Sequence, residues 1–147
     1  MNNRTEWALT ADCLCGAVSV TIAAKPEFIH DCNCSLCRKS GGAWGYFPTE
    51  VVKTSGDTVS FLRRDKWNDA AELQSCAHRG TTTHWTFSQA FKEQNEATDL
   101  MGVNMRIFNP DDLQDVELRF PDGSSWSGEG PFAYRREAVT INKSRPW

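Results

Sequence analysis

The placement of the six cysteines constrains this chain more than any other feature. Five of them fall in two short patterns, Cys13-Leu14-Cys15 and Cys32-Asn33-Cys34-Ser35-Leu36-Cys37, and the sixth is Cys76. Zinc prefers four tetrahedral thiolate or imidazole ligands, and cysteines separated by one or two residues can bind one ion without straining the intervening turn. The pattern therefore predicts metal-binding loops that hold distant parts of the chain together.

The bulk properties indicate one globular domain. A chain of 147 residues is long enough to bury its own core and too short for two ordinary domains, so we expect a single domain over residues 1–147. The formal charge of −3 gives no general attraction to phosphate backbones or anionic lipid, so a nucleic-acid partner is not expected.

The sequence also favours a reducing location for these thiols. It contains neither an apolar run of about 18 residues nor an apolar stretch near Met1 of the kind found in secretory signals. We therefore expect a cytoplasmic protein without a membrane partner, in which clustered cysteines bind metal or react. The even number of cysteines leaves a secreted domain with three disulfides as an alternative.

The hydrophobic pattern predicts a mainly β fold with short helices. Alternating or β-branched runs predict strands at 17–22, 28–30, 43–47, 58–62, 81–87, 103–108 and 116–120. A short element is expected to begin at 51–53, a helical turn or loop at 88–100, and a short helix at 110–113, where Pro110 opens the first turn. Loops are predicted at 63–71, around the second cysteine cluster and at Cys76, and the tail 127–147 has no clear period. The pair Gly41-Gly42 indicates a tight turn or a close approach to the backbone.

The first set of possible ligands, Cys13, Cys15 and Cys76, is one short of a closed tetrahedral site. Three residues beyond Cys76 stands Arg79, whose guanidinium stays charged and cannot bind zinc. His78 is the nearest substitute and would complete a site with three cysteines and one histidine. Otherwise this set binds zinc weakly, completes its shell with water, or has lost the metal.

The second set, Cys32, Cys34 and Cys37, offers three thiolates within six consecutive residues. Three protein ligands leave one coordination position open, as in a catalytic zinc site, and such a centre suits a soft ligand such as a substrate thiol. Two alternatives stay open: all six cysteines share one structural site, or some are free thiols. Cys34 and Cys37 also form a C-x-x-C pair, but no clear βαβ unit surrounds it, which disfavours dithiol redox chemistry.

These motifs resemble a known family. The ordered set Cys13-Leu14-Cys15-Gly16, then Cys32-Asn33-Cys34-Ser35-Leu36-Cys37-Arg38 with Ser40-Gly41, then Cys76 followed by Gly80-Thr81, is similar to the glutathione-dependent formaldehyde-activating enzyme family, which also includes centromere protein V. The motif core runs over residues 12–120. The resemblance implies an Mss4-like, β-rich zinc-binding fold, carbon–sulfur lyase chemistry and one or two zinc ions. It assigns a structural zinc to Cys13, Cys15 and Cys76 and a catalytic-type zinc to Cys32, Cys34 and Cys37, with the fourth structural cysteine replaced by Arg79.

The leading hypothesis is a zinc-dependent carbon–sulfur lyase-like enzyme that acts on the adduct of a small aldehyde with a thiol such as glutathione. Arg38 or Lys39 is a candidate partner for a substrate carboxylate, although both read more simply as solvated charges. The alternative is a non-catalytic, zinc-stabilised binding module for a protein or chromatin partner. The acidic balance of the chain speaks against nucleic acid in that role.

Other side chains have simpler expected roles. His84 is expected to be packed or hydrogen-bonded within a strand, and His30 to close a strand or support a metal ligand. Trp44, Tyr46 and Phe47 are expected in the core or along a groove beside the second cluster. The basic pairs Arg63-Arg64 and Arg135-Arg136 are expected to be solvated surface.

Overall fold

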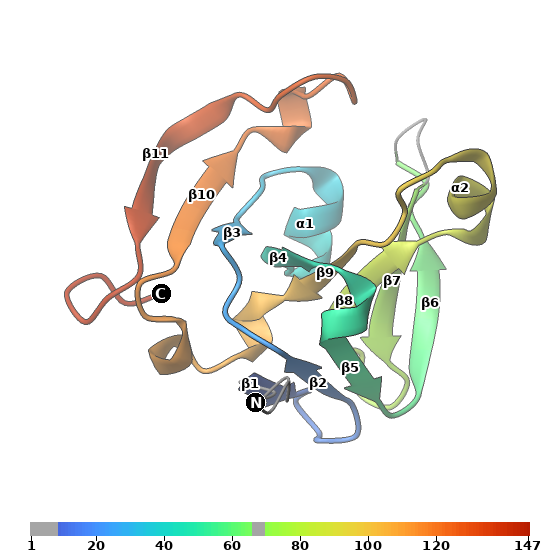
Figure 1. The fold of residues 1–147 in the computed structure, drawn as a ribbon, viewed down its shortest axis with the longest axis horizontal. Helices are drawn as coiled ribbons and strands as arrows, with labels where there is room; N and C mark the ends of the chain where they lie inside the picture. The colour runs from blue at the N-terminus through green and yellow to red at the C-terminus, as the bar shows by residue number, and fades with distance from the viewer. Residues whose placement is uncertain (1–8, 66–69) are drawn as a thin grey trace, which may run out of the picture.

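Two β-sheets form the framework of the computed structural model, which describes residues 9–65 and 70–147 (Figure 1). The small sheet has three antiparallel strands in the order β1-β2-β5, and the large sheet has eight strands in the order β11-β10-β3-β4-β9-β8-β7-β6. In the view of Figure 1 the small sheet lies below, with β11 and β6 at opposite ends of the large one. The fold is mainly β with two short α-helices, as the sequence predicts.

The strands have the following bounds: β1 Leu9–Asp12, β2 Ser19–Ile22, β3 Phe28–His30, β4 Trp44–Phe47, β5 Val52–Ser55, β6 Thr58–Leu62, β7 Ala71–Cys76, β8 Thr82–Phe87, β9 Met101–Asn104, β10 Glu117–Pro121 and β11 Tyr134–Thr140. The α-helices are α1 Ser35–Ser40 and α2 Gln89–Gln94, and 3-10 turns occupy Thr49–Val51, Met105–Ile107, Pro110–Leu113 and Gly123–Ser125. None of the helices described is long and apolar enough to cross a membrane.

Alternation of apolar and polar side chains accounts for the strands that the sequence predicts. In β2 the side chains of Val20 and Ile22 are buried, and in β10 those of Leu118 and Phe120 are buried, while the residues between them are partly exposed. These four residues join one core cluster with Ile29 and Val103. The core therefore lies where the small sheet packs against the centre of the large one.

One pairing carries the second cysteine cluster into the centre of the large sheet. Strand β3 pairs in parallel with β10 and antiparallel with β4, with His30 opposite Trp44. The buried Asn104 side chain accepts from the Ala43 N–H at 3.2 Å and donates to the Thr82 carbonyl at 2.8 Å. This amide joins β9 to the start of β4 and to β8, because a buried amide left without partners costs free energy.

Several local predictions are wrong for identifiable reasons. The second cluster is not all loop, since α1 begins after Cys34 and ends at Gly41, which adopts φ 73° at the helix C-terminus. Cys76 is the last residue of β7 rather than a loop residue, because it pairs with Thr58 of β6. The predicted strand 103–108 is β9 followed by a 3-10 turn, because the Asn104 side chain accepts from the Arg106 N–H.

The tail also contains structure that its sequence does not indicate. Residues Tyr134–Thr140 form β11, an exposed edge strand whose side chains have no buried face and hence no alternation. Part of the predicted loop at 63–71, residues 66–69, lies outside the described residues, as does the N-terminal stretch 1–8 that was compared with a secretory signal.

Candidate metal centre and adjoining pocket

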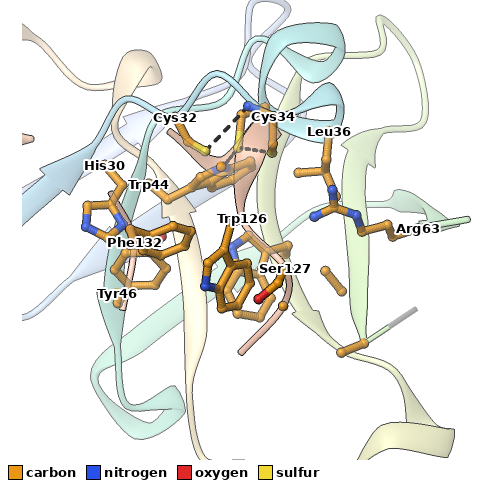
Figure 2. Close-up of a pocket in the computed structure, with 16 residues that line it drawn as sticks. His30, Cys32, Cys34, Leu36, Trp44, Tyr46, Arg63, Trp126, Ser127 and Phe132 are labelled. Atoms are coloured by element: carbon orange, nitrogen blue, oxygen red, sulfur yellow. Dashed lines mark hydrogen bonds between the residues drawn. The ribbon is translucent and has the colours of Figure 1, made fainter. Parts of the chain in front are cut away.

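The second cluster lies where β3 passes into α1 (Figure 2). Cys32 follows β3, Cys34 is the residue before the first turn of α1, and Cys37 lies within that helix. The three sulfur atoms lie within 4.8 Å of one another, with those of Cys34 and Cys37 3.2 Å apart. The short helix is what aims the last two thiols at the first, because residues three apart share one helix face.

Hydrogen bonds concentrate negative charge in this cluster. The Cys34 N–H points to the Cys32 sulfur at 3.5 Å, and the indole N–H of buried Trp44 donates to the Cys37 sulfur at 3.2 Å. The neighbouring thiols of Cys32 and then Cys37 hold the pKa of Cys34 well below its usual range. Interaction with Cys34 raises the pKa of Cys32, and interaction with Cys32 and then Cys34 raises the pKa of Cys37. One thiolate stabilised by two thiols is a suitable starting point for a metal, which displaces the remaining protons.

The first cluster gathers Cys13, Cys15 and Cys76, again within 4.8 Å of one another. The Cys15 sulfur lies 3.6 Å from each of the other two, although Cys76 is 61 positions further along the chain. Burial raises the pKa of Cys13, but hydrogen bonds, first from the Val18 N–H at 3.2 Å, lower it overall to about 7. This cluster joins the turn before β2 to the end of β7.

Both groups have a donor set that fits zinc. Zinc–sulfur bonds of about 2.3 Å at tetrahedral angles place neighbouring sulfur atoms about 3.8 Å apart, close to the 3.6 Å spacings of the first cluster. The second cluster is slightly tighter and needs a small expansion. Neither group contains a fourth described ligand. His78 is exposed and does not belong to the first group, so the structure does not bring it to the position that the sequence analysis considered.

A pocket of about 370 Å³ opens beside the second cluster. Its lining consists of the three cysteines together with His30, Leu36, Trp44, Tyr46, Arg63, Ala70, Ala71, Trp85, Gly123, Trp126, Ser127, Gly128 and Phe132. Figure 2 shows the ring of Trp126 below Cys32 and Cys34, with Arg63 on one side and His30, Tyr46 and Phe132 on the other. A cavity of this size lined by rings and a few polar groups is typical of small-molecule sites.

A tyrosine and a histidine supply polar groups on the pocket wall. The Tyr46 hydroxyl lies 3.0 Å from His30 Nδ1. Burial raises the pKa of Tyr46, so its hydroxyl keeps its proton. Burial, followed by the nearby Arg119 charge, lowers the pKa of His30 to about 4, and the imidazole is neutral at pH 7. Among the buried side-chain nitrogen and oxygen atoms of the described residues, His30 Nε2 is the one without a hydrogen-bond partner.

Some predicted roles are confirmed and others change. Trp44 and Tyr46 form the wall that the sequence analysis considered beside the cluster. His84 is packed and hydrogen-bonded locally, as predicted, with Nδ1 2.9 Å from the Thr83 hydroxyl. The prediction of solvated surface is wrong for Arg63, which lines the pocket with 17% of its side chain exposed, because Asp65 accepts from it at 2.7 and 3.1 Å.

The basic residues next to the cluster point elsewhere. Arg38 and Lys39 are exposed at the end of α1 and are not part of the pocket lining. There they favourably face the carbonyl end of the helix.

The sequence analysis missed the contribution of the tail to the site. Gly123, Trp126 and Phe132 line the pocket, and of these only Phe132 lies in the tail 127–147 for which the sequence showed no clear period. Residues 123–132 are called the tail segment below. A side-chain carbon at Gly123 would lie 2.3 Å from the Cys32 sulfur, so this glycine allows the tail to reach the cluster. The Asn33 side chain holds it there, donating to Asp122 Oδ1 at 2.8 Å and accepting from the Ser124 N–H at 3.0 Å. The two aromatic residues Trp126 and Phe132, which follow the turn Pro121-Asp122-Gly123, were the available signal.

Comparisons with known proteins agree with the motif pattern. A family model described as glutathione-dependent formaldehyde-activating enzyme matches residues 8–117. Among solved structures, a protein from Rhodobacter sphaeroides is similar in fold, with a TM-score of 0.54 and 23% sequence identity, over 74% of this chain and 97% of that one. No curated protein sequence matches the chain.

Proposed function

This chain belongs to the glutathione-dependent formaldehyde-activating enzyme family, and we propose on that premise that it is a carbon–sulfur lyase-like enzyme acting on the adduct of a thiol with a small aldehyde. The thiol is of the glutathione type. In our proposal Cys32, Cys34 and Cys37 hold a zinc ion as the reactive centre. The observation that carries the proposal is that these three thiols, with no fourth described ligand, form part of the wall of a small-molecule pocket.

The chemistry is a reversible addition that balances without an oxidant. In the forming direction, the thiol sulfur makes a bond to the aldehyde carbon, the carbon–oxygen π bond breaks, and the thiol proton ends on the oxygen. In the lyase direction the carbon–sulfur bond breaks and the proton returns to sulfur. Zinc, when bound, lowers the pKa of a substrate thiol and so supplies the nucleophilic form of the sulfur.

The protein's own groups bind and orient the reactants. The protonated Tyr46 hydroxyl is suited to donate a hydrogen bond to the aldehyde oxygen, where negative charge develops. Neutral His30 orients that hydroxyl from 3.0 Å. The rings of the pocket wall give the reacting atoms mainly apolar surroundings.

The remaining parts of the proposal concern the whole chain. We propose that Cys13, Cys15 and Cys76 hold a second, structural zinc, which would tie the small sheet to β7. We also propose that residues 1–147 form one domain, since β11 from the tail joins the same sheet as β6. A cytoplasmic location is consistent with all six cysteines being free thiols.

The test combines metal analysis with turnover. Protein purified without chelators should contain zinc, and Cys34→Ser should abolish turnover of the glutathione–formaldehyde adduct while Cys15→Ser retains most of it. Unchanged turnover in Cys34→Ser would refute the assignment of the reactive centre. Zinc without turnover of any adduct would favour the alternative of a non-catalytic binding module.

A further inference from the structure

We infer that the pocket selects thiol adducts that carry a flat apolar group, such as an aromatic ring, next to the sulfur-bearing carbon, and that the tail segment 123–132 determines this selectivity. The inference rests on the proposed function, because it takes the ligand sulfur to lie at the second cysteine cluster, and it changes one part of that function by making an apolar thiol, rather than glutathione, the preferred partner of the aldehyde. The segment lies beyond residues 8–117, so its contribution to the pocket belongs to this chain and not to the matched family model.

The first argument is the composition of the wall. Trp44, Tyr46 and Trp85 contribute rings from the large sheet, with those of Tyr46 and Trp85 6.3 Å apart in a T-shaped contact. The tail adds Trp126 and Phe132, whose ring centroids lie 4.6 Å apart. Aromatic faces and edges bind another ring in offset or T-shaped arrangements, so the wall is suited to a flat apolar group.

The tail segment is held in position rather than loosely laid over the pocket. The Trp126 indole N–H donates to the Gly130 carbonyl at 3.0 Å, which closes the segment on itself. Phe132 then contacts His30 edge-on, with ring centroids 5.7 Å apart. A wall that is ordered before binding loses little conformational entropy when the ligand enters.

The second argument is the charge of the pocket. Apart from the cysteines of the cluster, Arg63 is the one charged side chain among the described lining residues, and its guanidinium already donates twice to Asp65. Glutathione carries two carboxylates and one ammonium group at neutral pH. Within this lining the ammonium group has no carboxylate partner, and charges buried without partners are costly. An apolar substituent avoids that cost and gains contact with the rings.

The third argument is the position of the sulfur atoms. The lining that contains the rings also contains Cys32, Cys34 and Cys37. A ligand whose sulfur is held at the cluster therefore places its nearest substituent among the rings.

The test measures binding separately from turnover. Isothermal titration of the zinc-loaded protein under a non-thiol reductant compares phenylmethanethiol with glutathione. We expect phenylmethanethiol to bind at least about tenfold more tightly, and Trp126→Ala to weaken it by about tenfold or more while changing glutathione affinity less than about twofold. Trp147→Ala is the matched control, because Trp147 is half-buried outside the pocket, where it contacts Arg106.

Tighter binding of glutathione, or an equal effect of Trp126→Ala on both thiols, would overturn the inference. If Trp126→Ala does not fold, Phe132→Leu replaces it with the same expectations. Failure of the inference is distinguishable from failure of the proposed function. Loss of the ring preference with adduct turnover intact refutes only the inference, whereas ring preference without turnover of any adduct refutes only the proposed function.

Discussion

Substituting alanine for Gly123 should damage the second metal site without touching a ligand. The added carbon would lie 2.3 Å from the Cys32 sulfur and 3.2 Å from the Cys34 Cβ, whereas ordinary contacts begin at 3.4 Å. The sulfur or the tail must therefore move by about 1.1 Å, the difference between 3.4 and 2.3 Å. Zinc–ligand distances tolerate only about 0.2 Å of variation.

We therefore expect Gly123→Ala to lower zinc affinity at the second site by at least about tenfold. The assay is competition for zinc against a chromogenic chelator, read as two separate binding steps. The first cluster is an internal control, because Cys13, Cys15 and Cys76 have no described contact with Gly123. Ser124→Ala is the matched control, since it keeps the backbone N–H that Asn33 accepts from.

The backbone does not confound this experiment. Gly123 lies outside the left-handed region of φ, so alanine is compatible with its backbone and only the added carbon is tested. Zinc affinity at both sites equal to that of the wild type, with a folded protein, would show that the close approach of the tail to Cys32 is wrong.

Three further predictions concern His84, the hydrogen bond from Trp44 to Cys37, and Cys76. Burial lowers the pKa of His84 in the folded state to about 4, whereas its value in the unfolded state is about 6.5. As the pH falls, the unfolded state therefore binds a proton at His84 before the folded state does. The free energy of unfolding decreases between about pH 6.5 and pH 4. Urea titrations at pH 7 and pH 5 should show that the wild type loses about 2 kcal/mol more unfolding free energy than His84→Gln, and equal losses would contradict this. Trp44→Phe removes the indole N–H that donates to the Cys37 sulfur and should weaken zinc at the second site by about tenfold, as measured by the same competition assay; unchanged affinity would show that this hydrogen bond contributes nothing. Cys76→Ser should remove one zinc per chain and about 2 kcal/mol or more of stability, checked by metal analysis and thermal unfolding, and it should leave the second site loaded; loss of both ions would mean that the two clusters are not independent.

The cysteine sets could be predicted from sequence because their spacing is local chemistry. Thiols two or three positions apart come together in a tight turn or a first helical turn, as Cys34 and Cys37 do. The resemblance supplied Cys76, the long-range partner of Cys13 and Cys15. The glycine pair was also informative. Gly41 ends α1 with φ 73°, and a side-chain carbon at Gly42 would lie 2.1 Å from the Trp44 ring, so both the turn and the close approach are present.

The rest of the site depends on tertiary contacts that leave no period in the sequence. In the sequence Arg63 resembles a surface residue. In the structure its position directly after β6 and its ion pair with Asp65 place it on the pocket wall. Trp126 and Phe132 lie in a segment without regular secondary structure, so nothing in their spacing indicates which face they present. The family match does not indicate these residues either, because it ends at residue 117, before this segment begins.

The hydrogen bonds at Asn33 have a consequence for exchanging parts between proteins. They attach the chain at Asp122 and Ser124, which precede the pocket-lining rings of Trp126 and Phe132 in the sequence. A loop transplanted from another protein after residue 124 would keep this anchor and the glycine next to Cys32, whereas one that begins earlier would lose both. The chain thus has a natural splice point, at which the walls of the pocket can be rebuilt by design or by evolution while the cysteines stay unchanged.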